Sequence, residues 1–577
     1  MDTTKDPATK VTTETYFRHF DNRMPPHFPA MKDWQESLWH LLAGLCIGLG
    51  VWYLHWRWTS SLNPDAMAFS VLIVGAETLA FLGLVLFFFD IWKEGDTPRK
   101  EPPATRQDAG LEGDGPIHID VFLTTCDESA ALLEASIQAL KTLRVPRNMQ
   151  LHTYLLDDGN RAEIAQLAQS HGVEYLTRKN NIGFKAGNLR NALFKTNGDF
   201  VVILDADTRV LPTMLENTLG YFRDPKVAWV QTPHWFYDVP GETKGSKLKD
   251  PFMANPNVFF DVIQRRRNRD HASFCCGAGS IHRREAIFHD ALRQLGKDMD
   301  AYQKFLPETK DRAKASLRAT PAQPFRFHVS EDIFTSILMH SDPQSGWKSV
   351  YHPQAEARML SPWSVEAWTS QRLKYAGGTF DIMLNANPLW RKGMPLKTKL
   401  HYAATFWSYL SILWLSVLLM APVLSLFTGV APVNAYSLDF FLHLLPPLIM
   451  AEVATMVGCK GYNTTAGRLV TIGCLPLQWK ALWLVLRGRK PRFPPTPKVP
   501  GLAGAAKRLI PNFIVLAIMA AAAVFGIIAT LLELPGYTPS KTIVNIFWCS
   551  WNAFAVWMVV RLYWWSPEAE LQAVRAT

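Results

Sequence analysis

Cysteine is scarce in this 577-residue chain, and its cysteines do not form the closely spaced pairs typical of zinc sites. The seven cysteines are scattered, and only Cys275 and Cys276 are neighbours. This usage favours a reduced cytoplasmic domain over a disulfide framework. The sequence also lacks an internal repeat, a low-complexity tract, and a basic stripe with base-stacking aromatics. Its net charge of +10 therefore does not indicate a nucleic-acid partner.

Charged residues are also few, at 19% of the chain, and long apolar runs are present instead. Each of six runs approaches or exceeds the roughly 20 residues that a helix needs to cross a bilayer. One or two such runs also occur as buried helices in soluble proteins, but six with Trp and Tyr near their ends favour a membrane protein. The first run follows a long polar segment, unlike a cleaved signal peptide. The runs are Leu38–Trp56, Met67–Trp92, Phe406–Phe427, Phe440–Cys459, Ile510–Leu532 and Ile543–Trp565.

The distribution of Lys and Arg predicts the orientation of these runs. Basic residues gather in residues 1–37, in the large middle segment and in residues 460–508, whereas the short connections within each pair of runs carry only Arg57 and Lys541. Positively charged segments stay in the cytoplasm. Both termini and the middle segment are therefore predicted to be cytoplasmic, and the positive charge to face an anionic lipid bilayer.

The middle segment alternates between strand-like and helical patterns after a charged, Pro- and Gly-rich linker. Residues 117–128 (IHIDVFLTTCDE) and 149–159 (MQLHTYLLDDG) are strand-like, and residues 131–143 between them are helical. This βαβ rhythm predicts a mostly parallel sheet covered by helices, in which ligands bind at the carboxyl ends of the strands. Three predicted strands end in polar residues, which we expect to converge at one edge: Cys126–Glu128, Asp157–Gly159 and Asp205–Asp207.

Asp205 and Asp207 follow the apolar strand 201–204 and are separated only by Ala206. On an extended backbone their side chains leave the same face. Two carboxylates at a strand end, completed by phosphate oxygens, suit Mg²⁺ (or Mn²⁺). A lone pair of this kind is also typical of a solvated turn, so the interpretation depends on the motifs around it.

Three further motifs carry chemistry. Lys185 lies in NIGFKAGNLRNAL, where Gly183 and Gly187 permit close backbone approach and the ammonium can meet a phosphate. Glu331 and Asp332, in FHVSEDIF, are expected to follow a short strand and to offer a base to an attacking sugar hydroxyl. The segment QRLKYAGG belongs to a stretch that is aromatic on one side and basic on the other, which predicts a helix in the membrane interface.

This series of motifs resembles the membrane-integrated, processive family-2 glycosyltransferases, most closely the bacterial cellulose synthase group, over nearly the whole chain. The resemblance implies an α/β GT-A-like (Rossmann-like) domain inserted in a polytopic membrane domain of about six transmembrane helices plus interfacial helices, in the bacterial inner membrane. The expected segments are a cytoplasmic N-terminal segment (1–37), two transmembrane helices (38–92), a linker (93–115), the catalytic domain (116–358), interfacial helices (359–398), two transmembrane helices (399–460), an interfacial helix with a gating loop (461–508), two transmembrane helices (509–565) and a cytoplasmic tail (566–577).

The resemblance also implies a role for each motif. Asp332 would be the catalytic base, with Glu331 beside it, and Asp205 and Asp207 would hold the metal and the diphosphate. The donor nucleotide would be bound by Thr125, Asp127, Asp157, Asp158, Lys185, Gln371, Arg372 and Lys374, and by Phe493, Thr496 and Lys498 of the gating loop RFPPTPK. The acceptor would be bound by His234, Trp235, Cys276 and Tyr375, with Cys276 as a pocket wall and no nucleophile.

Departures from the family pattern leave the linkage of the product open. Lys374 replaces an Arg, and Tyr375 replaces the Trp on which the terminal sugar stacks. The first strand lacks the Tyr that stacks on uracil, and after Trp565 there is no room for the PilZ domain of bacterial cellulose synthases. The expected activity is inverting polymerisation of UDP-glucose into a β-glucan, which is 1,4-linked, 1,3-linked as in curdlan, or of mixed linkage.

The growing glucan would leave through a tunnel between the membrane helices and meet periplasmic or outer-membrane export partners; no oligomeric state is predicted. Four Trp residues either line the tunnel entrance or anchor the chain in the interface: Trp363, Trp368, Trp390 and Trp407. Arg561 either snorkels to the interface or faces a water-filled path. Two alternatives are a non-processive glycosyltransferase that modifies a lipid, and a transporter or scaffold whose soluble domain only binds nucleotide.

Overall fold

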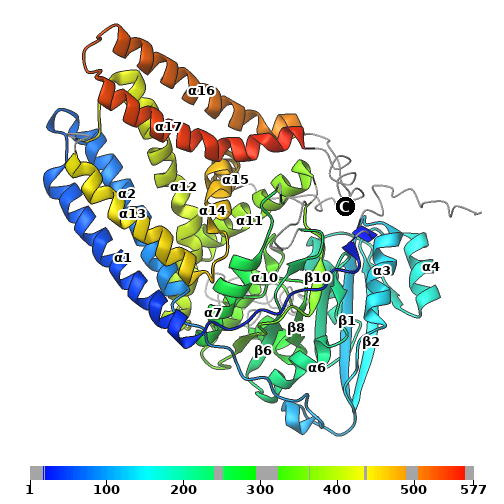
Figure 1. Cartoon of the computed structure of the whole chain (residues 1–577). Helices are drawn as coiled ribbons and strands as arrows, with labels where there is room; N and C mark the ends of the chain where they lie inside the picture. Colours follow the sequence, from blue (N-terminus) through cyan, green and yellow to red (C-terminus); the bar gives the residue numbers. More distant parts are fainter. Residues whose placement is uncertain are drawn as a thin grey trace, which may run out of the picture.

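The structure, a computed structural model, describes residues 17–18, 20–239, 250, 252–293, 323–362, 364–433, 438–488 and 505–565. It consists of an α/β part, with a large sheet, and a set of long helices that stand to one side of it (Figure 1). The predicted combination of a sheet domain with long apolar helices is therefore confirmed.

The large sheet contains seven strands in the order β3 (Glu174–Leu176), β2 (Met149–Asp157), β1 (Ile117–Thr125), β4 (Phe200–Asp205), β8 (Ser280–Arg283), β6 (Val227–Gln231) and β9 (Lys348–Tyr351). The first four strands are parallel, β8 runs antiparallel to both its neighbours, and β6 and β9 are again parallel. The mostly parallel sheet predicted from the sequence is thus confirmed, with β8 as the exception.

Alternating side chains of the central strands supply a core on both faces of the sheet. Val121 and Leu123 pack on one face with Leu133 of α3 (Ala130–Leu140), whereas Phe122 and Ile203 pack on the other with α5 (Phe184–Leu193). In the sequence, strands that are buried on both faces form continuous apolar runs. The other helices against the sheet are α4 (Ala162–His171), α6 (Met214–Thr218) and α10 (Glu331–His340).

A second, three-stranded sheet, β5 (Arg209–Val210), β10 (Ala357–Met359) and β7 (Trp235–Phe236), lies beside the first. Residues 20–32, here called the N-terminal strap, cross the α/β part and reach this sheet (dark blue in Figure 1). The Arg23 guanidinium donates to the Tyr237 carbonyl at 2.7 Å, and the Phe28 N–H donates to Gln354 at 2.9 Å. The strap therefore connects the first long helix to the α/β part.

Six helices in the described part of the chain are long and apolar enough to cross a membrane. Helix α1 packs on α13 and α2 packs on α12, which pairs helices from distant parts of the sequence, whereas α16 packs on the next helix in the chain, α17. These helices are α1 (Asp33–Ser60), α2 (Met67–Asp90), α12 (Leu396–Thr428), α13 (Leu438–Gly458), α16 (Ala505–Leu531) and α17 (Pro539–Val560).

Three shorter helices lie between the sheet and the long helices (Figure 1). Helix α11 (Val365–Asn385) begins where the Ser364 hydroxyl accepts the Ala367 N–H, and it packs on α15 (Leu475–Leu486) and α12. Helices α14 (Thr464–Gly473) and α15 meet at an angle of 57°, and only together are they long and apolar enough for one more span.

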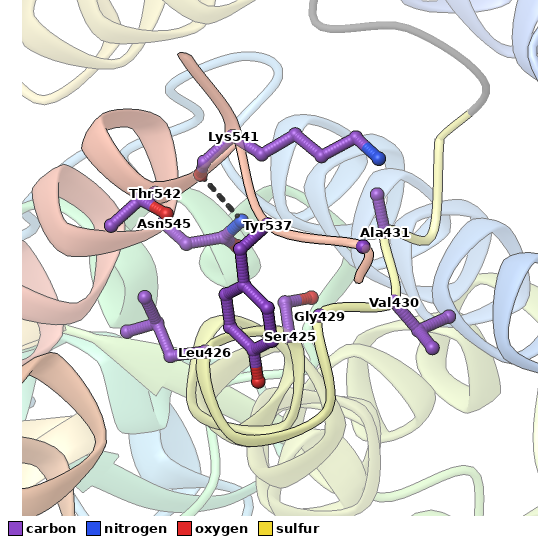
Figure 2. Close-up of a pocket in the computed structure, with 10 residues that line it drawn as sticks. Ser425, Leu426, Gly429, Val430, Ala431, Tyr537, Lys541, Thr542 and Asn545 are labelled. Carbon is purple, nitrogen blue, oxygen red and sulfur yellow. Dashed lines mark hydrogen bonds between the residues drawn. The ribbon is translucent and has the colours of Figure 1, made fainter. Parts of the chain in front are cut away.

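A small pocket lies at the ends of α12 and α17 (Figure 2). Gly429 ends α12 with φ of +72°, and a Cβ there would lie 2.8 Å from the Tyr537 ring. Glycine thus lets Tyr537 lie against α12, beside Ser425 and Leu426 in Figure 2. The loops after α12 and before α17 therefore close tightly on each other.

Buried ion pairs attach the α/β part to the long helices through η5 (Val258–Gln264), α7 (Arg265–Arg267) and η6 (Asn268–Asp270). The Arg267 guanidinium makes two bonds, of 2.8 and 2.6 Å, to Asp90 at the end of α2. His401 on α12 bridges Asp90 and Asp270 at 2.7 and 3.1 Å. Two membrane-type helices are thereby bonded to one segment of the α/β part.

Replacing Asp90 by Ala should destabilise the protein by about 3–5 kcal/mol, because Arg267 would remain buried without its carboxylate. Thermal unfolding of the detergent-solubilised protein would measure this loss. Glu101→Gln is the matched control, since Glu101 pairs with Arg99 at the surface and such pairs contribute at most about 1 kcal/mol. Equal unfolding temperatures for the two variants would contradict the proposed attachment.

Candidate active site

The carboxyl ends of three neighbouring parallel strands form one edge of the site. Thr125 at the end of β1 pairs with Asp157 at the end of β2, and Thr124 pairs with Asp205 at the end of β4. The convergence predicted for the polar strand ends is thus confirmed. Side chains from these positions share one edge of the sheet.

Asp157 and Asp158 stabilise the loops at this edge. Asp157 is buried and accepts the N–H groups of Gly159 and Arg161 at 2.9 and 2.8 Å. Asp158 receives two bonds from Arg178, of 2.6 and 2.7 Å, and Arg178 also donates to carbonyls of the loop before α5. A nucleotide bound at Asp158 would therefore meet a carboxylate that is already charge-compensated.

Thr125 and Asp127 differ in their surroundings. The Thr125 hydroxyl donates to Glu128 at 2.7 Å and accepts from Arg161 at 2.9 Å, so it is held within the loop after β1. Asp127, in contrast, is exposed. Of these two predicted nucleotide ligands, Asp127 has the more accessible side chain.

The Asp-Ala-Asp segment does not continue the strand, contrary to the expectation that both carboxylates leave one extended face. Strand β4 ends at Asp205, and Ala206 and Asp207 form a turn in which the Thr208 N–H donates to the Asp205 carbonyl. The Asp205 side chain is 42% exposed, whereas Asp207 is buried and accepts the Leu360 N–H at 3.1 Å. The turn separates the two side chains because it rotates the backbone after Asp205.

Lys185 on α5 reaches Asp205, with 2.5 Å between Nζ and Oδ1. Gly183 starts the helix with φ of +80°, and a Cβ on Gly187 would lie 2.1 Å from the Ile182 carbonyl. Both glycines thus permit close backbone approach, as predicted. Burial by itself would lower the pKa of Lys185, but the charges of Asp205 and Glu331 outweigh it and raise that pKa above its ordinary value.

Glu331 and Asp332 lie in the first turn of α10, and residues 323–330 contain no strand, so the strand expected before them is absent. Gly277, in the segment FCCGAGS, lies between the two charged groups. A Cβ on Gly277 would be 3.6 Å from Lys185 Nζ and 3.7 Å from Asp332 Oδ2. Since only a hydrogen occupies that space, the ammonium and the carboxylate face the same small volume.

Burial raises the pKa of both acids of α10. Burial and the charge of Asp332 raise the pKa of Glu331 to about 7, although Lys185 opposes the shift. Burial also raises the pKa of Asp332 above its ordinary value, against bonds from the Ile333 N–H and the charge of Lys185. A carboxylate with a raised pKa is a stronger base than an ordinary one.

The predicted acceptor residues occupy different environments. Burial raises the pKa of Cys276 well above its ordinary value, which fits a pocket wall and no nucleophile. Burial lowers the pKa of His234 to about 4, and its Nε2 lies 2.8 Å from the Ala278 carbonyl. Trp235 is buried in a cluster with Phe17 and Phe20, so its ring contacts protein rather than an open pocket.

Helix α11 carries the segment Gln371–Tyr375 next to α10. Gln371 and Lys374 are partly buried, the Arg372 guanidinium lies 5.7 Å from the Trp368 ring centre, and Tyr375 is 48% exposed. Tyr375 is thus the predicted acceptor residue with the most accessible ring.

The three tryptophans that the structure describes differ in their surroundings. Trp368 is buried and donates to the Phe252 carbonyl, Trp407 donates to the Leu79 carbonyl of α2, and Trp390 is 82% exposed. Arg561 begins the short helix η8 (Arg561–Trp564) and donates to the Met558 carbonyl. Other predicted residues lie outside the described residues: Trp363, Phe493, Thr496 and Lys498.

The donor set fits a divalent cation that arrives with phosphate. Among the described residues there is no cluster of three or more His, Cys, Asp or Glu side chains that could hold a metal. Mg²⁺ commonly takes one or two carboxylates together with substrate phosphates and water. Asp205, with an accessible carboxylate, meets that requirement, whereas Asp207 is buried and accepts the Leu360 N–H.

Several residues of the site had no recognisable sequence signal. Arg178 is separated from Asp158 by 20 positions, and His328, although part of FHVSEDIF, and Asp381 have no role that their sequence context indicates. Gly378 was noticed only as part of QRLKYAGG, yet a Cβ there would lie 2.0 Å from the Ser330 hydroxyl. In the sequence, the signal for this close packing is that Gly378 lies in a helical pattern next to other small residues.

Comparisons with known proteins agree with this geometry. A family described as "Glycosyl transferase family group 2" matches residues 200–452. "Cellulose synthase 2" of Novacetimonas hansenii is 28% identical over 82% of this chain and 28% of the relative, and the "Cellulose synthase catalytic subunit [UDP-forming]" of Pseudomonas fluorescens is 28% identical over 70% and 49%. The chain thus spans about half the length, or less, of these curated relatives.

Among solved structures, a mannosyltransferase of Pyrobaculum calidifontis, in complex with GDP-Man and Mn2+, matches 73% of this chain and 99% of its own, at 15% identity and a TM-score of 0.46. The sheet described above and the matching family confirm the predicted GT-A-like fold. The six apolar helices and the relatives identify a multi-pass membrane protein. Residues 200–452 therefore match a glycosyl transferase family group 2, and the chain is similar over most of its length to bacterial cellulose synthase catalytic subunits, as its motifs predicted.

Proposed function

We propose that this protein is a processive, inverting glycosyltransferase that polymerises glucose from UDP-glucose into a β-glucan and moves the chain across the cytoplasmic membrane. One observation carries the proposal. Lys185, Asp205 and Asp332 come from three distant segments and gather around Gly277, beside helix α11. This arrangement offers a phosphate ligand, a metal ligand and a base to one substrate.

Asp332 takes the proton of the acceptor hydroxyl, whose oxygen attacks the anomeric carbon of the donor. UDP leaves from the opposite face, so a single displacement inverts the configuration and converts an α-linked donor into a β-linked product. Lys185 moves between Asp205 and the diphosphate, to which an ammonium binds as a point charge. A divalent cation held by Asp205 and Asp207 would supply charge stabilisation to the leaving diphosphate.

The position of α10 supports export of the product. Ile333 and Ile337 pack in one cluster with Ile382 of α11 and with Tyr402 and Phe406 of α12. The proposed base is therefore on a helix that contacts the end of a membrane helix. A glucan extended at Asp332 would emerge beside the membrane-type helices rather than on a free face of the sheet.

A 1,3-linked or mixed-linkage glucan is the second candidate product, because Tyr375 and Lys374 occupy the expected acceptor position on α11. A Tyr ring offers less stacking area than Trp, and an ammonium cannot make the two parallel bonds of a guanidinium. Both changes alter which hydroxyl reaches Asp332. Digestion of the product with glucanases specific for 1,3 or 1,4 linkages distinguishes the candidates.

Purified protein should convert UDP-glucose into glucanase-sensitive polymer, and Asp332→Asn should lower the rate at least about a hundredfold because the base is lost. Radiolabel incorporation measures the rate, and calorimetry should show UDP binding within about twofold of the unaltered protein, a change of under about 0.5 kcal/mol. Undiminished synthesis by Asp332→Asn would show that Asp332 is not the base. A product of one sugar on a lipid would favour the non-processive alternative.

The reaction needs Asp332 deprotonated, and the pKa of Asp332 is raised. As the pH is lowered, the rate should therefore begin to fall at a higher pH than it would with a base of ordinary carboxyl pKa; this fall is the acid limb of the pH profile. Glu331→Gln removes a neighbouring negative charge and should shift this acid limb to lower pH. Initial rates measured from mildly acidic to mildly alkaline pH would test this. Glu285→Gln, an exposed acid, should leave the limb in place, and an unmoved limb in Glu331→Gln would contradict the coupling.

Chelation with EDTA should abolish synthesis, and Mg²⁺ or Mn²⁺ should restore it. The reason is that the proposed cation ligands are the accessible carboxylate of Asp205 and the buried carboxylate of Asp207. Asp205→Asn should lose the metal-dependent part of UDP binding. Asp114→Asn, an exposed acid in the linker, serves as the control. Full activity in EDTA would show that Lys185 alone neutralises the diphosphate.

A further inference from the structure

One histidine connects the loop before α10 to helix α11. His328 Nδ1 lies 2.9 Å from the Ser330 N–H and accepts it, whereas Nε2 lies 2.9 Å from Asp381 Oδ2 and donates to it. Because a backbone N–H can only donate, the proton of the neutral ring is placed on Nε2. Both edges of the ring are thus used, and the side chain is only 12% exposed.

The backbone of α11 also packs closely against side chains of this loop. Gly378 lies one turn before Asp381 on α11, and a Cβ there would lie 2.0 Å from the Ser330 hydroxyl and 3.0 Å from Val329 Cγ1. No larger residue fits at that point without separating the two segments. Hydrogen bonds and close packing therefore fasten the same loop to the same helix.

These contacts join the two halves of the proposed reaction. Ser330 immediately precedes Glu331 and Asp332, and Asp332 is oriented by the Ile333 N–H at 2.8 Å. Helix α11 carries Tyr375 in the turn before Gly378. The Gly378 contact and the His328 hydrogen bonds thus connect the acceptor motif on α11 to the loop that precedes the base.

The body of α10 has a separate anchor. The Ser336 hydroxyl donates to the Asp332 carbonyl at 2.9 Å and accepts the Cys275 N–H at 2.8 Å. Ile333 and Ile337 are buried against neighbouring helices. Loss of His328 would therefore release the first turn of α10 while the rest of the helix stays packed.

We propose that His328 and Asp381, with Gly378, are positioning residues that hold the acceptor-binding helix and the base at one fixed separation. The proposal rests on the proposed function, in which Asp332 deprotonates the acceptor. A misplacement of about 1 Å between reacting groups can lower a rate on the order of a hundredfold. None of the three residues belongs to the donor-binding set, so their effect falls on transfer and not on UDP binding.

The test compares His328→Ala, Asp381→Ala and Gly378→Ala in the full-length protein. Each should lower kcat about 10- to 100-fold while KM for UDP-glucose and UDP affinity stay within about twofold, or under about 0.5 kcal/mol. Matched controls are His289→Ala, a half-exposed histidine, and Gly467→Ala, where a Cβ would meet nothing within 4 Å. Both controls should keep the kcat of the unaltered protein.

A double variant, His328→Ala with Asp381→Ala, should be no slower than either single variant, because both remove the same connection. Two further variants each keep one of the two hydrogen bonds of His328. His328→Gln keeps a donor towards Asp381, and His328→Asn keeps an acceptor for the Ser330 N–H. Each should recover part of the kcat lost in His328→Ala.

Unchanged kcat in both His328→Ala and Gly378→Ala would overturn the proposal, as would multiplicative losses in the double variant. A lowered unfolding temperature with unchanged kcat would show a purely structural role and would also overturn it. Failure of the unaltered protein to transfer glucose from UDP-glucose is a different result, because it refutes the proposed function on which this inference rests.

Discussion

The arrangement of the site depends on the attraction between the ammonium of Lys185 and the carboxylates around it. The ammonium lies against Asp205 and within the field of Glu331 and Asp332, three carboxylates brought by two separate segments of the chain. Without a cation in that position, burial and repulsion would make the ionised acids unfavourable. Glycines make the position reachable: Gly183 and Gly187 allow α5 to approach, and Gly277 leaves the space between ammonium and base empty of side chain.

The site is also defined by its attachment to the long helices. Arg267, Asp90 and His401 bond the α/β part to α2 and α12, and the N-terminal strap bonds it to the start of α1. Helix α10 packs against α11 and α12 through apolar side chains. A polymerase that extends a chain into a membrane needs its base at such a junction, because the product must leave in a constant direction from the point of transfer.

Residues with similar sequence signals turned out to have different surroundings. Asp157 and Asp207 are buried and accept backbone N–H groups, whereas Asp205 keeps an accessible carboxylate. The difference arises from local geometry. A strand that ends in a turn directs one acid outwards and the other inwards, and a backbone N–H of a nearby segment then donates to the inward carboxylate. Trp235 illustrates the same point, since its ring completes a core with the N-terminal strap.

The sequence by itself predicted a mostly parallel sheet, the convergence of its polar strand ends at one edge and six long apolar helices, because apolar periodicity and strand-end polarity are local properties. It did not predict that Glu331 starts a helix, that Asp207 turns inwards, or that Arg178, His328 and Asp381 hold the loops. Those features depend on contacts between segments that lie tens to hundreds of residues apart, such as Asp207 with Leu360 and His328 with Asp381. Only the tertiary structure decides them, because a hydrogen bond of this kind exists only after packing has brought its donor and acceptor together.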